Sequence, residues 1–525
     1  MVTSDTVNVE IEHGEWWWGG AAADGTLMPF GRETSHHRDL ARNAGLVNDP
    51  ADASNQSAPV LISSHGRVIA SDQPFTFTIE DGQLRAEGTG VQTATADVAT
   101  LRGAYREAVR RFMPASGRTP APELFEGPQY NTWIELPYTP TQQGVLDYAR
   151  RILAAGFPPG VLMIDDLWAA DYGDWRFEAG RFPDPRAMVD ELHRLGFRVM
   201  VWVVPFISPD NAVYRALERR DLLLRGADGE IVVRRWWNGW SAVLDLTFAP
   251  ACDWWADTLR ALQAETGVDG FKFDAGDLRD YRDDDQGRGG IGRIAQTAAY
   301  ARFGEQFAFN EFRASWRAGG LGLAQRLHDK PPTWDAAGLG SLIPEGIAQS
   351  LTGHAFNCPD MIGGGDLAQF EPGAAVDVEQ FVRYAQCAAL FPMMQFSLNP
   401  ARVLDEEALA AVKAAVALRQ ALVPEILALV AHAARTGEPI LRPLAYHDPG
   451  TEQVTDQFLL GKDVLVAPVL ERGATHRQVV LPHGRWAPLG TGMPDGQVVE
   501  VTGDPVTLTL DVTLASLPAW RRIHG

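Results

Sequence analysis

Residues 267–277 read Gly267-Val-Asp-Gly-Phe-Lys-Phe-Asp-Ala-Gly-Asp277. A short, mostly apolar run over 270–273 ends directly in Asp274, and a helical pattern over Ala249–Thr266 precedes it. Short apolar strands that alternate with helices predict a parallel α/β fold. When such a fold closes into a barrel, its chemistry lies at the carboxyl ends of the strands. Asp274 is therefore expected at the rim of a site.

The same helix–strand unit recurs on both sides of this stretch. Strands are expected at Asn131–Leu136, Val161–Asp165, Val199–Val204, Gly270–Asp274, Phe307–Glu311, Thr333–Asp335, Phe356–Asp360 and Met394–Ser397. Helical patterns between them cover Gln142–Ala155, Pro185–Leu195, Ala249–Thr266, Leu342–Leu351 and Val378–Leu390. Eight strands separated by helices predict a closed (β/α)₈ barrel of the TIM type, because the strand count closes at eight.

The barrel pattern is flanked by two β-rich regions. Alternating stretches at Val7–Ile11, Val60–Ile62 and Phe75–Ile79 are separated by turn residues. After a helix at Glu406–Val430, strands are expected at Asp456–Val469, Arg477–Leu481, Val498–Val501 and Val506–Leu510. The predicted organisation is an N-terminal β-sandwich over 1–125, a catalytic (β/α)₈ barrel over 126–432 and a small C-terminal β-sandwich over 433–525.

The net charge and the tryptophan content of the chain indicate which kind of molecule it binds. The chain of 525 residues carries a formal net charge of −21, which argues against nucleic acid or an anionic membrane and favours a neutral or cationic small molecule. Sixteen Trp residues suit sugars, whose apolar faces stack on indole rings, although most Trp side chains belong to cores. We expect no membrane span and no secretory signal, hence a cytoplasmic location.

The cysteines and histidines do not indicate a metal site. Cys252, Cys358 and Cys387 are widely separated and match no zinc spacing, so free thiols in a reducing compartment are expected. The histidines form no ligand set. We expect no metal and no cofactor, and the sequence leaves open whether the chain forms a homo-oligomer.

Carboxylates cluster at the ends of the expected strands. Asp165 and Asp166 follow one strand, and Asp274, Asp335 and Asp360 follow three others. Any single one is at least as well explained as a helix cap, but several together indicate a site. Two carboxylates, about 5 Å apart in a retaining enzyme, are what glycoside hydrolysis requires.

The two carboxylates need opposite environments. The acid needs a raised pKa, and Trp334 beside Asp335 offers an apolar neighbour, although neighbours on a strand point in opposite directions. The nucleophile must stay ionised. Lys272 lies two residues before Asp274 on the same strand face, where its charge favours the anion. A lysine pointing into a barrel is costly unless it is paired, so Lys272 is expected to be functional.

These residues carry a family resemblance that extends from about Gly127 to the C-terminus. Lys272-Phe-Asp-Ala-Gly276 resembles the nucleophile strand of family 31 glycoside hydrolases, within the branch of the myogenesis-regulating glycosidase and bacterial α-galactosidases. Other matching motifs follow in order: Trp236-Trp-Asn-Gly239, Leu244-Asp-Leu-Thr247, Gly338-Leu-Gly-Ser-Leu-Ile-Pro344, Pro359-Asp-Met-Ile-Gly-Gly364, Pro439-Ile-Leu-Arg-Pro443 and Leu465-Val-Ala-Pro468. In the N-terminal region, Gly14-Glu-Trp-Trp-Trp-Gly-Gly20 resembles a loop that reaches over the barrel mouth.

The resemblance implies a role for each matching position. Asp274 matches the nucleophile and Asp335 the general acid/base. The family commonly shows Gly-Asp-Asn at the second position, where this chain has Thr333-Trp-Asp-Ala336, which leaves a one-residue shift open. Asp165 or Asp166 matches the carboxylate that grips sugar hydroxyls; alternation allows only one to face the site, and Asp165 is favoured. The other substrate-binding matches are Asp360, Arg313 with Arg326 as competitor, and Trp202, Trp237 and Trp17 as pocket walls.

One departure from the family bears on the sugar. Typical α-glucosidases of the family carry an Arg-Asn-His motif after the last strand, and here the stretch is Phe391-Pro-Met-Met-Gln-Phe-Ser397. The missing His favours galactose. The resemblance thus implies a retaining exo-α-glycosidase that cleaves terminal α-linked hexose, most specifically α-galactoside, through a glycosyl-aspartate. An α-glucosidase or α-xylosidase, transfer to a sugar hydroxyl instead of water, and an inactive sugar-binding protein are the alternatives.

Overall fold

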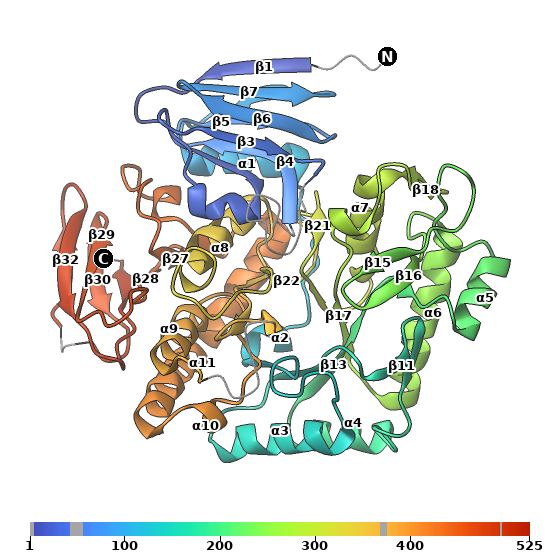
Figure 1. The fold of residues 1–525 in the computed structure, drawn as a ribbon. Helices are drawn as coiled ribbons and strands as arrows, with labels where there is room; N and C mark the ends of the chain where they lie inside the picture. Colours follow the sequence, from blue (N-terminus) through green and yellow to red (C-terminus); the bar gives the residue numbers. More distant parts are fainter. Residues whose placement is uncertain (1–4, 43–55, 368–374, 494–495, 525) are drawn as a thin grey trace.

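The computed structural model describes residues 5–42, 56–367, 375–493 and 496–524 of the chain. Its central part is a ring of parallel strands, with one β-sandwich above the ring and another beside it (Figure 1). The expected α/β architecture, a (β/α)₈ barrel between an N-terminal and a C-terminal β-sandwich, is confirmed.

The barrel sheet pairs its strands in parallel throughout. In sheet order its strands are β23 (Asn357–Cys358), β22 (Gln325–Arg326), β20 (Phe309–Phe312), β17 (Gly270–Phe273), β13 (Arg198–Val203), β10 (Val161–Ile164), β9 (Gln129–Asn131), β25 (Gln395–Phe396) and β24 (Met361–Ile362). Only Pro359 and Asp360 separate β23 from β24, so these two are halves of one interrupted strand. β23 pairs with β22, and β24 pairs with β25, so the ring closes at eight.

Two of the eight strands differ from their predicted ranges. The first, β9, covers Gln129–Asn131 and shares only Asn131 with the predicted Asn131–Leu136. The sixth lies elsewhere altogether. The sequence predicts the sixth strand at Thr333–Asp335, whereas that segment is irregular and the sixth strand is β22, Gln325–Arg326. β22 is two polar residues long, so it lacks the apolar run by which buried strands are recognised. This shift moves the carboxyl end of the strand several residues toward the N-terminus.

The helices around the barrel lie close to their predicted ranges. They include α3 (Gln142–Ala154), α4 (Pro185–Arg194), α6 (Ala249–Thr266), α8 (Leu342–Leu351) and α9 (Val378–Ala389). A further helix, α7 (Gly292–Gly304), lies where no helix is predicted from the sequence. Helix α6 has Pro250 in its first turn and ends at Gly267, whose φ of +83° closes the helix in the left-handed conformation. The turn then leads directly into β17, which delivers Asp274.

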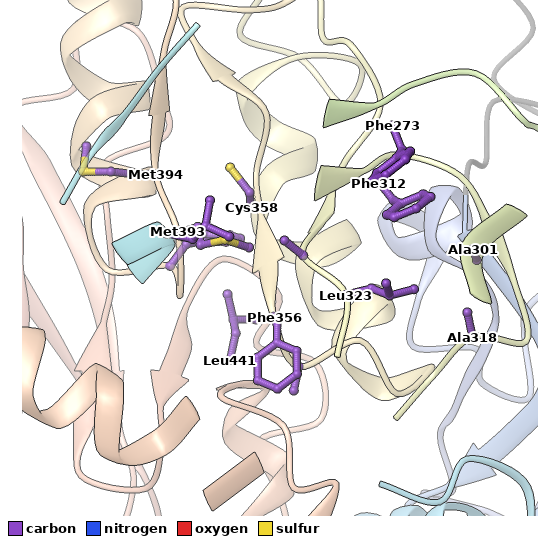
Figure 2. Close-up of a cluster of buried hydrophobic side chains, with 14 of the residues drawn as sticks. Phe273, Ala301, Phe312, Ala318, Leu323, Phe356, Cys358, Met393, Met394 and Leu441 are labelled. Carbon is purple, nitrogen blue, oxygen red and sulfur yellow. The ribbon is translucent and has the colours of Figure 1, made fainter. Parts of the chain in front are cut away.

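Large apolar side chains fill the space between the barrel wall and its helices (Figure 2). Phe273 of β17 and Phe312 of β20 stack with ring centroids 4.8 Å apart, and both are fully buried. Trp255 of α6 lies against Phe303 of α7 at 4.6 Å. Burying each of these rings stabilises the fold by roughly 1.5–3 kcal/mol, so the wall that carries Asp274 is rigidly supported.

A long helix, α11 (Glu406–Thr436), packs against α9 and α2 (Glu123–Glu126). By length and composition it would be long and apolar enough to cross a membrane, which corrects the expectation that no segment is. Its Arg419 is completely buried and donates to four backbone carbonyls: those of Phe125, Ala389, Phe391 and Pro392. Arg419 thereby ties the segment before β9 to the segment before β25.

The N-terminal sandwich consists of two antiparallel sheets. One contains β1 (Asp5–Glu10), β7 (Gln83–Gly88), β6 (Phe75–Glu80) and β3 (His36–Asp39); the other contains β2 (Trp17–Ala21), β4 (Gln56–Ser63), β5 (Arg67–Ala70) and β8 (Gln92–Thr95). A strand from the barrel loops, β21 (Ser315–Trp316), joins the second sheet by pairing in parallel with β4. Helix α1 (Leu101–Phe112) packs beneath β4 and β5.

The C-terminal sandwich has a six-stranded and a two-stranded sheet. The larger contains β26 (Leu441–Arg442), β27 (Phe458–Leu460), β28 (Val464–Val466), β33 (Ala519–Ile523), β30 (Gly484–Pro488) and β31 (Val499–Val501); the smaller pairs β29 (His476–Leu481) with β32 (Val506–Asp511). The predicted single stretch Asp456–Val469 is a hairpin of two strands, β27 and β28, because Gly461 turns the chain between them.

Candidate active site

A cavity of about 580 Å³ lies at the carboxyl ends of the barrel strands. Barrel residues line most of it, and η1 (Ala22–Leu27) of the N-terminal region contributes part of one wall. The lining residues are Ala23, Thr26, Trp133, Tyr138, Asp165, Asp166, Trp202, Trp237, Asn238, Lys272, Asp274, Arg279, Arg313, His328, Asp329, Pro331, Ala336, Ala337, Glu345, Gly365, Asp366 and Leu367. The volume suits a small ligand such as one or two sugar rings.

Asp274 is held rigidly at the base of this cavity. Its backbone N–H donates to the Val203 carbonyl at 2.9 Å, and its own carbonyl accepts from the Tyr300 hydroxyl at 2.7 Å. The indole Nε1 of Trp202 donates to Oδ2 at 2.7 Å, and Nε of Arg313 lies 2.9 Å from Oδ1. Both carboxylate oxygens are therefore fixed in direction.

The surroundings of Asp274 favour its ionised form. Burial alone would raise its pKa, but the positive charges of Arg313, Lys272 and Arg326, together with the hydrogen bond from Trp202, hold the pKa well below its usual range. Asp274 is thus an anion at every physiological pH, which is the state that a nucleophile requires. The expectation that Lys272 favours this anion agrees with the geometry.

Both members of the Asp165–Asp166 pair line the cavity, which corrects the expectation that only one faces it. Strand β10 ends at Ile164, and Leu167 takes a φ of +66°, so the two aspartates lie in a turn where strand alternation no longer applies. Asp165 forms an ion pair with Lys272 Nζ at 2.5 Å. Lys272 is therefore both buried and paired.

Asp166 has a different environment from its neighbour. It accepts hydrogen bonds from the Tyr172 hydroxyl at 3.1 Å, from the Leu167 N–H at 2.6 Å and from the amide of Asn238. Burial and the adjacent Asp165 charge raise the pKa of Asp166 to about 7. The turn therefore presents one carboxylate paired with Lys272 and one that gains or loses a proton near neutral pH.

This raised pKa leads to a testable pH dependence. Asp166 binds a proton more tightly in the folded than in the unfolded chain, so the native state loses stability as the pH rises from about 4 to 7. Replacing Asp166 by Asn removes that loss. We expect the stability of Asp166→Asn relative to wild type to increase between pH 5 and pH 8, by on the order of 1 kcal/mol in the free energy of unfolding. The difference in Tm between the two proteins should become more positive over the same range. Exposed Asp210→Asn serves as control, and a pH-independent difference for Asp166→Asn would contradict the expectation.

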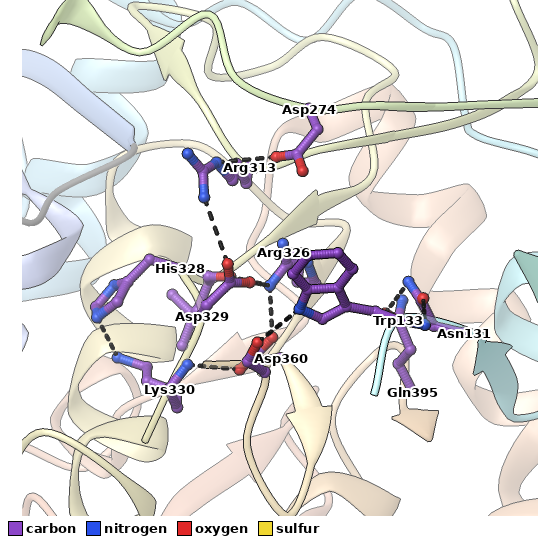
Figure 3. A network of polar contacts seen from close by, with 12 residues as sticks. Asn131, Trp133, Asp274, Arg313, Arg326, His328, Asp329, Lys330, Asp360 and Gln395 are labelled. Carbon is purple, nitrogen blue, oxygen red and sulfur yellow. Dashed lines mark hydrogen bonds and ion pairs between the residues drawn. The ribbon is translucent and has the colours of Figure 1, made fainter. Parts of the chain in front are cut away.

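Arg313 connects two carboxylates across the cavity (Figure 3). It follows β20, and its Nη1 lies 3.5 Å from Oδ2 of Asp329, while its Nε contacts Asp274. Nη2 pairs with Asp277 at 2.9 Å, and the guanidinium stacks 5.0 Å from the ring of Trp237. A single guanidinium group therefore bridges Asp274 and Asp329.

Asp329 was not among the residues predicted from sequence. It follows the true sixth strand by three residues, lines the cavity and is one third exposed, so a ligand can reach it. Its Oδ1 accepts from Arg326 Nη1 at 2.8 Å. Its neighbour His328 also lines the cavity and contacts Lys330 at 3.1 Å, and Lys330 pairs with Glu345 at 2.5 Å.

Asp335 is exposed and is not among the cavity-lining residues. Its Oδ1 accepts from the Thr333 hydroxyl at 2.8 Å and from the N–H groups of Ala337 and Gly338 at 3.1 and 3.3 Å. The hydrogen bond from Thr333 and those backbone bonds lower the pKa of Asp335, whereas an acid needs a raised pKa. Its geometry is that of a cap on the following turn at 336–338, and does not support the role expected from sequence.

Asp360 and Arg326 lie beneath the cavity, not in its wall. Asp360 occupies the break between β23 and β24 with a φ of +97°, and is completely buried. It pairs with Arg326 Nη1 at 2.5 Å and accepts from the Lys330 N–H at 2.8 Å. Asp360 therefore holds the residues that carry Asp329 in place, which corrects its predicted role as a direct substrate ligand; of the two competing arginines, Arg313 lines the cavity.

Two of the three tryptophans predicted as pocket walls line the cavity, and the third does not. Trp202 and Trp237 line the cavity. Trp17 lies in β2, completely buried within the N-terminal sandwich, with the Arg67 guanidinium 5.4 Å from its ring. Its expected position over the barrel mouth is therefore wrong; Ala23 and Thr26 of η1 reach the cavity instead.

Comparison with known proteins places these features in context. The model of the TIM-barrel domain of glycosyl hydrolases family 31 matches residues 125–429, and that family's C-terminal domain model matches 437–522. The chain is 36% identical over 416 residues to the myogenesis-regulating glycosidase of Mus musculus, covering 77% of this chain and 58% of the relative. It is 30% identical over 387 residues to a 1,3-alpha-isomaltosidase of Kribbella flavida, covering 65% and 50%. The chain thus spans little more than half the length of these relatives.

Solved structures of the same family share the fold. A dextranase from Flavobacterium johnsoniae, in complex with isomaltotriose, superimposes with a TM-score of 0.84 at 20% identity, over 99% of this chain and 66% of the dextranase. An alpha-xylosidase from a soil metagenome, in complex with xylose, superimposes with a TM-score of 0.81 at 21% identity.

Proposed function

Because this chain belongs to glycosyl hydrolase family 31, we propose that it is a retaining exo-α-glycosidase that removes a terminal α-linked hexose, with α-galactosides as its preferred substrates. The observation that carries the proposal is the arrangement of Asp274 and Asp329 in one sugar-sized cavity, connected by the Arg313 guanidinium. A double displacement requires two carboxyl groups in one site, one that attacks the anomeric carbon and one that gives and takes the proton.

In the first step Asp274 attacks the anomeric carbon. Its carboxylate oxygen forms a bond to C1 as the bond from C1 to the glycosidic oxygen breaks, and the leaving oxygen takes a proton from the general acid. Trp202 and Arg313 orient the attacking carboxylate, and Lys272 and Arg326 keep it ionised. In the second step water attacks C1, gives its proton to the same group and releases Asp274, so the configuration at C1 is retained.

We assign the acid/base role to Asp329. Its position supports this: it lines the cavity, shares Arg313 with Asp274, and follows a barrel strand at its carboxyl end. His328-Asp329-Lys330 also has its aspartate in the same central place as the Gly-Asp-Asn of the family. Asp335 offers none of these features, since backbone N–H groups already occupy its carboxylate.

The pocket also supports the choice of sugar. Asp165 and Asp166 present carboxylate oxygens that accept from sugar hydroxyls, and Trp133 and Trp202 offer indole faces to the ring. At the end of the last strand, Gln395 and Ser397 are both completely buried and bond to protein groups. The stretch 391–397 contains no counterpart of the His found there in typical α-glucosidases of the family, and this difference supports galactose over glucose.

A panel of 4-nitrophenyl α-glycosides tests the proposal. We expect the full-length protein to cleave the α-galactoside with a kcat/KM roughly 10-fold or more above that for the α-glucoside and the α-xyloside. The β-galactoside should not be cleaved, and NMR should show α-galactose as the first-formed product. A preference for α-glucoside or α-xyloside would keep the mechanism and replace the sugar. Absence of cleavage across the panel, with monosaccharide binding retained, would instead indicate an inactive sugar-binding protein.

A further inference from the structure

A glutamine of the N-terminal sandwich reaches the carboxyl end of the barrel. Gln56 is the first residue of β4, and it lies opposite Ser315 in the parallel pairing of β4 with β21. Figure 1 shows this junction, where β21 extends from the barrel toward the N-terminal sandwich. The Gln56 side chain is buried and directed toward the ends of β20 and β22.

The side-chain amide of Gln56 binds two backbone carbonyls. Its Nε2 lies 2.7 Å from the carbonyl oxygen of Arg313 and 2.7 Å from that of Arg326. A primary amide has two N–H donors, so each carbonyl can receive one of them. The Gln325 Oε1 lies further away, at 3.3 Å. One side chain from a different domain therefore holds both site arginines by their main chain.

These carbonyls lie where the barrel sheet opens. β20 and β22 pair through Phe312 and Gln325, and beyond that point the two strands diverge. Arg313 is the first residue past β20, and Arg326 is the last residue of β22. A buried carbonyl without a donor is costly, so the Gln56 amide replaces the hydrogen bonds that the sheet no longer supplies.

The same two arginines control the proposed catalytic pair. Arg313 contacts Asp274 and Asp329, and Arg326 contacts Asp329. Figure 3 shows both guanidinium groups converging on Asp329. Displacing either main chain would therefore move a guanidinium relative to the carboxylates, and displacements of about 1 Å near reacting groups cost on the order of 10²-fold in rate.

We propose that Gln56 is a positioning residue: by bridging the carbonyls of Arg313 and Arg326 it sets the spacing of the two arginines, and through them that of Asp274 and Asp329. This inference rests on the proposed function for its effect on rate. The N-terminal sandwich would then take part in catalysis through a side chain that does not touch the substrate.

The test compares two buried glutamines in the full-length protein. Gln56→Met keeps the length of the side chain and removes both donors. The matched control is Gln457→Met in the C-terminal sandwich, where Gln457 is equally buried and bonds the main chain of Val480 at 3.0 and 2.8 Å. Both variants lose buried hydrogen bonds, but only the first releases the arginines.

Three measurements distinguish a role of Gln56 in positioning the arginines from a role in the stability of the fold alone. We expect kcat of Gln56→Met for the best aryl α-glycoside to fall roughly 10–100-fold, while Gln457→Met changes it less than about threefold at a similar loss of Tm. The acidic limb of the kcat/KM profile should move to higher pH only in Gln56→Met, because the charges that lower the pKa of Asp274 recede. Hydrogen exchange should accelerate in peptides that cover 309–316 and 323–330.

The outcomes are distinguishable. Equal kcat and an unshifted pH profile in the two variants would overturn the positioning role even if both lose stability. If the wild-type protein cleaves no glycoside, the proposed function fails by itself, and hydrogen exchange still decides about Gln56: unchanged exchange at 309–316 and 323–330 in Gln56→Met would overturn it.

Discussion

Asp274→Ala is expected to lower kcat for aryl α-glycosides by on the order of 10⁴–10⁶-fold, as removal of a nucleophile does in other enzymes with covalent intermediates. The fold should survive, because the Asp274 contacts to Val203 and Tyr300 are made by its main chain. The loss should appear in kcat and kcat/KM together, since attack on C1 occurs only in the transition state.

Rescue by added azide tests whether the side chain removed in Asp274→Ala is the nucleophile. In Asp274→Ala the truncated side chain leaves room beside C1, and azide that enters there displaces the aglycone once. We expect added azide to restore turnover and to yield the β-glycosyl azide, detected by NMR as the inverted product. Unaltered kcat, or rescue that gives the α-azide, would show that Asp274 is not the nucleophile.

Asp329→Ala should give the second largest effect, with a different signature. Loss of a general acid/base costs roughly 10²–10⁴-fold for substrates whose leaving group needs a proton. An activated leaving group such as 2,4-dinitrophenol needs no proton, so the first step should remain fast. The glycosyl-enzyme then accumulates, and a burst of 2,4-dinitrophenol should precede slow turnover. Azide should then attack the intermediate and yield the α-glycosyl azide, after two displacements.

Asp335→Ala is the matched control for this experiment. Asp335 is six residues further along the same loop and binds Thr333, Ala337 and Gly338. We expect kcat to change by less than about threefold, with a stability loss of about 1 kcal/mol from the missing cap. If Asp335→Ala showed the burst and the α-azide while Asp329→Ala did not, the assignment would be reversed.

Much of the architecture could be predicted from sequence because its elements have strong periodicity. The ranges Ala249–Thr266 and Leu342–Leu351 coincide with α6 and α8, and the apolar runs of β10, β13 and β17 are within one residue of their observed bounds. Asp274 followed from this, since a strand assigned correctly also places the carboxylate at its end.

The assignment of the general acid/base to Asp335 disagrees with the structure because the strand before the acid has no strong periodicity. Gln325–Arg326 is short and polar, so no hydrophobic signal marks it as a strand, whereas Thr333-Trp334 has the β-forming residues of one. The error in the strand carried over to the carboxylate assigned to its end. Had the strand been placed at β22, Asp329 would have been the carboxylate that follows it.

Other misses reflect geometry that alternation rules do not contain. Asp165 and Asp166 both reach the cavity because the chain has already left the strand at Ile164. The Gln56 bridge joins residues about 260 positions apart, through the main chain of the partners, and no sequence pattern encodes such a contact.

The four carbonyls bound by Arg419 have a consequence for biosynthesis. The segment leading into the first barrel strand is held at Phe125, and that leading into the last strand at Ala389, Phe391 and Pro392, by a residue encoded after all eight strands. A nascent chain that has emerged only as far as β25 therefore lacks the Arg419 hydrogen bonds that connect the segments before the first and the last barrel strands. The ring becomes secured only when α11 has left the ribosome, so truncated translation products that stop before residue 419 should remain open and sensitive to protease.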